Sequence, residues 1–117
     1  IISLHFSIFP ISIVVLMTAA NREEASRIAE MLVDAHLAAC VQILPETQSV
    51  YRWQGEVARE SEVLLLAKTT LDRFDDLDRA VRESHSYETP EIIALPVTAV
   101  SAPYLDWLQE GVSSQPA

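Results

Sequence analysis

Three segments of the chain gather side chains that bind ligands or move protons in proteins. The first runs from His85 to Glu91 and holds an imidazole, a phenol and two carboxylates within seven residues. Such a segment suits a metal ion or a small polar ligand, and it is equally typical of an ordinary connection between a helix and a strand. Tyr51 and Trp53 stand close together in the second segment. The third segment runs from Glu60 to Lys68, the only lysine of the chain.

Lys68 directly follows five consecutive apolar residues, Val63 to Ala67. Its ammonium either emerges into solvent at the end of a strand or lies partly desolvated beside a carboxylate. Side chains alternate between the faces of a strand, so Leu64 and Leu66 point away from their neighbours. Helices bury only one face, and each leucine left in water forgoes about 1.5–3 kcal/mol. We therefore expect identical copies of the chain to cover the other face; the alternative is cover by the C-terminal helix.

Most catalytic motifs are missing from the sequence. Gly55 and Gly111 are the only glycines, so there is no glycine-rich phosphate loop, and no histidine lies four residues from another as in helical zinc motifs. Cys40 lies in an apolar segment, whereas a reactive thiol needs accessible, electropositive surroundings. We therefore expect that the protein is not an enzyme.

The charge balance excludes several classes of partner. The chain has 117 residues and carries 8 basic against 17 acidic side chains, a net charge of −9. Nucleic acids and anionic membranes repel such a chain, so we expect neither as a partner. A single cysteine allows no intrachain disulfide and is compatible with a reducing compartment, so a cytoplasmic location is expected.

The apolar start of the chain resembles a targeting segment only superficially. Residues 1–17 are rich in Ile, Leu, Phe and Val, but serines, His5 and Pro10 interrupt them and no basic residue precedes them. They fit neither a membrane span of about 20 apolar residues nor a secretory signal. We divide the chain into an N-terminal extension (residues 1–9), one domain (10–112) and a C-terminal tail (113–117).

The hydrophobic pattern predicts four strands and three helices in the order β-α-β-β-α-β-α. Asn21 and Glu24 form a capping box at the start of the first helix, Gln54 and Gly55 form a tight turn, and Thr70 caps the second helix. The order is that of a ferredoxin-like α+β fold with an antiparallel sheet. The expected strands are Ile11–Thr18, Ala39–Trp53 with a break at Pro45, Glu56–Thr69 and Ile92–Val97, and the helices are Arg22–Ala35, about 70–84, and Ser101–Gly111.

Three short motifs together resemble the CutA family of divalent-cation tolerance proteins. They are Leu-Ala-Ala-Cys at 37–40, Tyr-Arg-Trp-Gln-Gly at 51–55 and Pro-Glu-Ile-Ile-Ala-Leu-Pro at 90–96, and the resemblance covers about residues 13–108. It implies a fold similar to that of the small PII signalling proteins. It also implies trimers in which long hairpins extend sheets between subunits, and a link to tolerance of copper and other divalent cations.

The resemblance implies a metal site that this chain keeps only in part. In some members copper binding is attributed to a cysteine at the end of the first strand and to two histidines before a Tyr-Glu-x-Pro segment. Those positions here are Met17, Ser84 and His85, so only His85 is retained. Met17 either offers a thioether to Cu(I) or packs in the core. The usual proline after the histidine is Ser86, a change expected to loosen the loop.

The resemblance also implies a cleft between subunits that binds a metal ion or a small anionic ligand. We expect copper or another divalent cation to contact His85 and Met17, and Lys68 to contact an anion. The expected function is a homotrimer in the homeostasis of divalent cations. The alternatives are a PII-like sensor of a small molecule and an acylphosphatase-like hydrolase, for which the chain offers a lone Arg22. The residues assigned to the cleft are Tyr51, Trp53, Lys68, Tyr87, Glu88 and Glu91.

Overall fold

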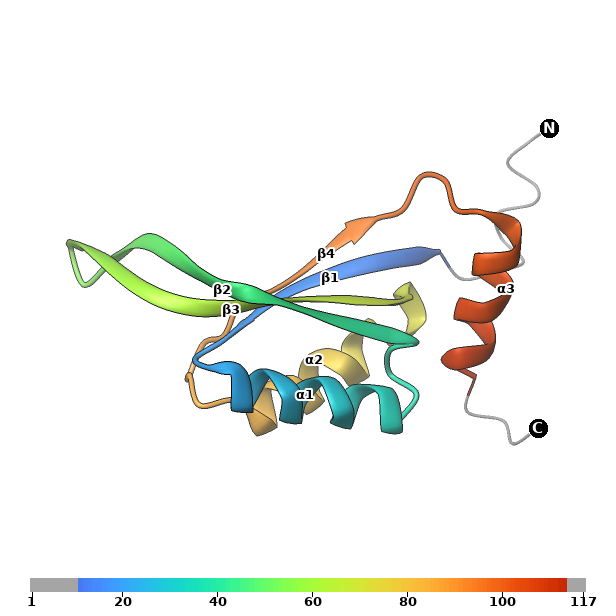
Figure 1. Cartoon of the computed structure of the whole chain (residues 1–117), viewed down its shortest axis with the longest axis horizontal. Coiled ribbons are helices and arrows are strands. Elements are labelled where there is room, and N and C mark those ends of the chain that lie inside the picture. The colour runs from blue at the N-terminus through green and yellow to red at the C-terminus, as the bar shows by residue number, and fades with distance from the viewer. Residues whose placement is uncertain (1–10, 114–117) are drawn as a thin grey trace.

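The computed structural model describes residues 11–113, which form four strands, three helices and one 3-10 turn (Figure 1). The predicted extension 1–9 and residues 114–117 of the predicted tail lie outside this range. No helix within it is long and apolar enough to cross a membrane. In chain order the elements are β1 (Ser12–Ala19), α1 (Arg22–Asp34), β2 (Cys40–Trp53), β3 (Glu56–Thr70), η2 (Leu71–Arg73), α2 (Phe74–Ser84), β4 (Ile92–Pro96) and α3 (Ala102–Gly111).

The strands form one antiparallel sheet in the order β2-β3-β1-β4. α1 and α2 lie against the same face of this sheet, and α3 stands at one end of it (Figure 1). Met17 and Leu65 from the sheet pack with Ile28, Leu32 and Leu77 from the two helices in a core that excludes water. The predicted ferredoxin-like α+β fold is confirmed.

The two faces of the sheet differ as the alternating pattern predicts. Leu65 is fully buried under the helices, whereas Leu64 and Leu66 lie half-buried on the other side. Ile93 and Leu95 join that second face and are 51% and 45% exposed, so α3 does not cover it. We call this surface the open face, formed by Val14, Leu16, Leu64, Leu66, Ile93 and Leu95.

The β2–β3 hairpin extends beyond the helices as an arm, residues 46–61, along the 50 Å long axis of the molecule (Figure 1). At its base the pairing steps from Ile43 with Leu65 to Glu46 with Val63, so two residues of β2 oppose one of β3. The predicted break at Pro45 is therefore a β-bulge within a continuous strand. The bulge changes which β2 residues share the open face, from the even-numbered to the odd-numbered positions.

The arm ends in the tight turn predicted from the sequence. Gln54 and Gly55 have φ of 50° and 82°, the left-handed values that a two-residue hairpin turn of this hand requires. Trp53 and Val57 beside the turn are each 62% exposed. The tip of the arm thus exposes two large apolar side chains.

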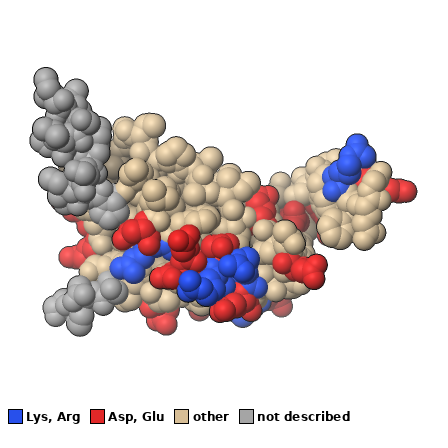
Figure 2. All heavy atoms as spheres, turned by 180° about the vertical axis from the view of Figure 1, so that it is seen from behind, with Lys and Arg blue, Asp and Glu red and all other residues tan. Residues whose placement is uncertain are grey.

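One predicted cap is wrong. Thr70 makes no capping bond to α2, because η2 intervenes and the Thr70 hydroxyl donates to the Asp72 carboxylate instead. β4 lies at the edge of the sheet and ends at Pro96, one residue before the expected end at Val97. Charged side chains crowd the helical layer, whereas an uncharged area lies above it on the side of β4 (Figure 2).

Candidate functional site

The connection between α2 and β4 is fastened to the sheet through the His85 imidazole. The side chain is fully buried. Its Nε2–H donates to the Thr18 carbonyl oxygen at 2.7 Å, and its Nδ1 accepts the backbone N–H of Tyr87 at 2.9 Å. Because Nδ1 accepts a hydrogen bond, it carries no proton, and these partners assign the neutral Nε2–H tautomer. Both ring nitrogens are therefore already occupied by hydrogen bonds to backbone.

A buried carboxylate, that of Glu24, also holds the connection between α2 and β4 in place. Its oxygens accept the backbone N–H groups of Ala20 at 2.9 Å and Ser86 at 2.7 Å, and the Ser86 hydroxyl at 3.1 Å. Burial raises the pKa of Glu24, but the donated hydrogen bonds outweigh it and hold the pKa below its ordinary value. Asn21 caps α1 by accepting the Glu24 N–H, which confirms one half of the predicted capping box. The other half differs, because the Glu24 carboxylate accepts the N–H of Ala20 rather than that of Asn21.

Ser86 corrects an expectation drawn from the sequence. Its replacement of proline was expected to loosen the loop. Instead its backbone N–H and its hydroxyl both donate to Glu24, and proline offers neither donor. The serine therefore fastens the loop.

A group of phenols and carboxylates lies beyond this loop, at the base of the arm. The Tyr87 hydroxyl donates to Glu62 at 2.9 Å, and Tyr51 of β2 is hydrogen-bonded to Glu60 of β3. Glu62 is 8% exposed. We call this group the carboxylate cluster, formed by Tyr51, Glu60, Glu62, Tyr87 and Glu91.

The surroundings of the cluster raise the pKa values of both phenols and of the Glu91 carboxyl. Burial and then the bond to Glu62 raise the pKa of Tyr87 far above its ordinary value. The bond to Glu60, followed by burial, raises the pKa of Tyr51. Burial and then the charge of Glu62 raise the pKa of Glu91. Negative charge at this end of the sheet is therefore incompletely compensated within one chain.

The remaining predicted cleft residues lie elsewhere in the chain. Lys68 projects from the same face of β3 as Glu62, but six residues along the strand, about 20 Å at 3.4 Å per residue. It is half-buried and donates to the Gln42 side-chain oxygen, so its partner is an amide. Trp53 stands at the arm tip, and Glu88 is exposed in the loop. A single chain thus brings Tyr51, Tyr87 and Glu91 together and leaves Lys68, Trp53 and Glu88 apart.

The two predicted metal ligands do not fit a copper ion as the structure arranges them. Met17 is 1% exposed and faces the core under the helices, between Leu65 and Ile92 of the flanking strands. His85 has no free ring nitrogen. Within residues 11–113, no group of three or more His, Cys, Asp or Glu side chains is arranged to hold a metal ion.

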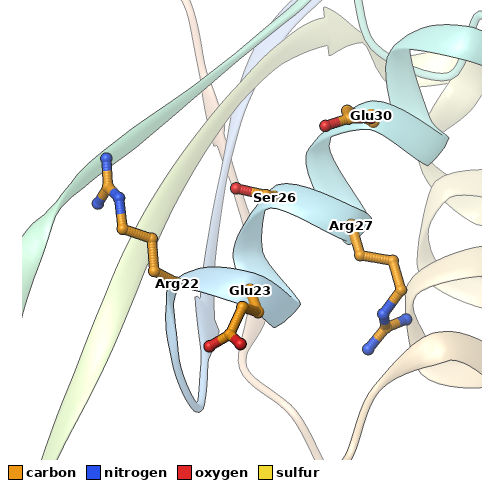
Figure 3. Close-up of a pocket in the computed structure, with 5 residues that line it drawn as sticks. All are labelled: Arg22, Glu23, Ser26, Arg27 and Glu30. Atoms are coloured by element: carbon orange, nitrogen blue, oxygen red, sulfur yellow. The ribbon is translucent and has the colours of Figure 1, made fainter.

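An open hollow runs along the outer side of α1, away from the cluster. Its lining side chains point in different directions, with Arg22 and Arg27 on opposite sides of the helix (Figure 3). Arg27 is already bonded to the Ser84 carbonyl oxygen at 2.9 Å. The hollow therefore offers no convergent set of binding groups. The residues that line it are Arg22, Glu23, Ser26, Arg27 and Glu30.

Sequence reasoning missed Glu24, Glu60 and Glu62 as parts of this site. Glu24 was assigned only to a helix cap, and the two others were parts of a strand segment noted for its polar residues. Side chains alternate between the two faces of a strand, so the sequence already places Glu60 and Glu62 on the same face of β3 as Leu64. This alternation is the signal from which the two glutamates could have been predicted.

The family model described as CutA1 divalent ion tolerance protein matches residues 13–111. The chain belongs to this family. Among its relatives, the Thermus thermophilus divalent-cation tolerance protein CutA is 50% identical over 97 residues, which cover 83% of the chain and 94% of that protein. The chloroplastic protein CutA of Arabidopsis thaliana is 46% identical over 98 residues, 84% of the chain and 54% of that relative. The chain thus spans about half the length of the plant protein.

Solved structures of CutA1 proteins share the fold. The Thermus thermophilus structure gives a TM-score of 0.85 at 48% identity and covers 87% of this chain and 99% of its own. CutA1 from Oryza sativa gives 0.87 at 40% identity, covering 91% and 97%. The resemblance noted in the sequence is confirmed. One relative is named chloroplastic and an Archaeoglobus fulgidus structure is named periplasmic, so the cytoplasmic location stays a prediction.

Proposed function

We propose that the chain acts without catalysis in the homeostasis of copper and other divalent cations, as a homotrimer that binds its ligand in clefts between copies. The observation that carries the proposal is membership of the CutA1 divalent ion tolerance family over residues 13–111. The open face supports the assembly, because Ile93 and Leu95 remain about half exposed on it in one chain.

Within one chain the described carboxylates are not arranged to hold a metal ion, so in this proposal the carboxylate cluster binds a divalent cation only together with ligands from a second copy. Among the described residues no ion pair joins Glu60, Glu62 or Glu91 to a lysine or arginine. Carboxylate and phenol oxygens suit hard divalent ions such as Mg²⁺ or Mn²⁺ better than they suit Cu(I). In this proposal Lys68, Trp53 and Glu88 reach the same cleft only when different copies supply them.

Calorimetric titration of the metal-free protein with Mn²⁺, Mg²⁺ and Cu²⁺ tests the cation site. We expect Glu62→Gln to weaken cation binding at least tenfold, because it removes a charged ligand. Glu30→Gln on α1 makes the same change of charge away from the cluster and is expected to leave affinity unchanged. Equal affinity in the wild type and Glu62→Gln, or no binding of any cation, contradicts the proposal.

Copper titration of His85→Ala tests the predicted copper contact separately. Equal affinity for Cu²⁺ in this variant and the wild type removes His85 from the metal site and leaves the carboxylates as the ligands.

A PII-like sensor is the second candidate, and Lys68 is the observation that favours it. Its ammonium is half-buried on the sheet and bonded to the neutral Gln42 amide, which leaves its charge free to attract an anionic metabolite. A metabolite that raises the melting temperature when divalent cations do not would favour this function.

A further inference from the structure

The His85 and Glu24 side chains join segments of the chain that are far apart in sequence. His85 reaches the Thr18 carbonyl oxygen at the end of β1, 67 residues earlier. Glu24 at the start of α1 accepts from Ser86, 62 residues later. We call His85 and Glu24 the loop latch, because together they hold the loop after α2 against β1 and α1.

We propose that His85 is a positioning residue rather than a metal ligand, and that the loop latch holds the Tyr87 phenol on Glu62. The Nδ1 atom of His85 accepts the backbone N–H of Tyr87, the same residue whose hydroxyl bonds Glu62. The two rings also lie close, with centroids 4.8 Å apart. The bonds at the two ends of Tyr87 therefore fix its backbone and its side chain together.

The chemistry of the imidazole explains why it is unsuited to a metal here. A metal ion binds the unprotonated nitrogen of histidine, which is Nδ1 in this tautomer. Coordination at Nδ1 displaces the Tyr87 N–H, and coordination at Nε2 removes the proton donated to Thr18. Either change leaves a backbone group without its partner beside a fully buried side chain. Metal binding at His85 thus requires the loop to open.

The latch is measured in the ligand-free protein by amide hydrogen exchange. We expect the Tyr87 amide to exchange at least tenfold faster in His85→Phe than in the wild type, because phenylalanine keeps the ring and removes both hydrogen bonds. His36→Asn is the matched control, because it also removes an imidazole that is hydrogen-bonded to a backbone carbonyl oxygen. His36 follows the C-terminal end of α1 and bonds the carbonyl oxygen of Gly111 in α3, away from Tyr87. It is expected to leave Tyr87 protection unchanged. Equal exchange at Tyr87 in His85→Phe and the wild type overturns the latch.

Proton NMR of the Tyr87 hydroxyl at pH 7 shows whether positioning reaches the cluster. The difference between the spectrum of each protein and that of its Tyr87→Phe derivative isolates this proton, which the bond to Glu62 protects from exchange with water. We expect the hydroxyl proton to exchange at least tenfold faster in His85→Phe than in the wild type, while circular dichroism shows a folded chain. Unchanged exchange overturns the positioning role.

Nitrogen NMR of the wild-type imidazole keeps the proposal falsifiable if His85→Phe fails to fold. The expected signature is protonated Nε2 and unprotonated Nδ1, unchanged when Zn²⁺ is added as a diamagnetic probe. A protonated Nδ1, or a metal-induced shift typical of a coordinated nitrogen, overturns the proposal. The relevance of Tyr87 to ligand binding rests on the proposed function, but the latch itself does not. Failure of cation binding at Glu62 therefore leaves these measurements intact, and failure of the latch leaves that titration intact.

Discussion

At the scale of single residues, the structure keeps a buried carboxylate charged by surrounding it with donors. Glu24 is 6% exposed, yet the N–H groups of Ala20 and Ser86 stabilise its charge more than burial opposes it. Its pKa therefore lies below the ordinary 4.5 in the folded state. A carboxyl group with a lowered pKa stabilises the fold above its unfolded pKa, and this contribution is lost as the pH falls through the folded value.

Glu24→Gln tests this contribution. At pH 7 we expect the variant to be less stable by about 1–3 kcal/mol, because an amide NH₂ then faces a backbone N–H donor. The difference from the wild type should shrink as the pH falls below 4.5, where the wild type begins to lose the ionised carboxylate. Urea denaturation of both proteins between pH 7 and pH 3 measures it. A difference that stays constant down to pH 3 contradicts the assigned role.

Glu91 predicts a pH dependence of the opposite sign. Burial and the charge of Glu62 raise its pKa above 4.5, so the folded chain binds this proton more tightly than the unfolded chain does. Stability from this group is full below pH 4.5 and falls as the pH rises through the raised value. Glu91→Gln is therefore expected to be more stable than the wild type at pH 7, and the gap should close by about pH 4.5. A variant less stable at pH 7 contradicts this expectation.

The sequence predicted the site less fully than the fold, for a physical reason. The pattern identified the loop that holds His85, but not its partner Thr18, because nothing local marks a hydrogen bond across 67 residues. The bond between Tyr87 and Glu62 likewise depends on how the loop packs against β3. Residue types predicted which groups are capable of chemistry, and only the packing shows which of them are already engaged.

At the scale of elements, periodicity was sufficient wherever one face of an element is buried. The strands and helices lie within a few residues of the predicted ranges, because alternation in strands and the 3.6-residue period in helices follow directly from burial. The predictions fail where a different local hydrogen bond replaces the expected one. At Thr70, the hydroxyl donates to the Asp72 carboxylate and does not cap α2. The bulge at Pro45 is similar, since a proline indicates a disturbance but not which residues re-pair after it.

The docking of α3 depends on the last residue of that helix. A Cβ placed on Gly111 would lie 2.9 Å from the Ala39 Cβ, so alanine there forces the helix or the β2 entry to move. We expect Gly111→Ala to destabilise the protein by about 1–3 kcal/mol, as overpacking does, despite the better helix propensity of alanine. Denaturant titration measures the loss. Ala39→Gly in the same chain should restore part of it, and a stabilised Gly111→Ala contradicts the contact.

At the scale of the whole molecule, the open face and the arm are the two surfaces on which one chain leaves large apolar side chains exposed. Alternation along β3 predicted the open face, and the register places Leu16 of β1 between Leu66 and Ile93 on it. The arm carries Trp53 and Val57 beyond the helices, where nothing in the described part of the chain buries them. The proposed homotrimer would bury both surfaces against other copies of the chain.

Leu95→Glu tests the proposed homotrimer directly, because the substitution places a charge on the open face and changes no residue of the core. Leu95 is 45% exposed in one chain, so the monomer tolerates a glutamate, whereas an assembly that buries this face must desolvate its charge. We expect light scattering at micromolar concentration to give three times the 13.0 kDa chain mass for the wild type and a mass near that of one chain for Leu95→Glu. Leu71→Glu is the matched control, since Leu71 is 50% exposed in η2, outside the open face, and it should remain a trimer. A wild type that scatters as a single chain, or a Leu95→Glu protein that stays trimeric, would remove the open face from the assembly and the proposed clefts with it.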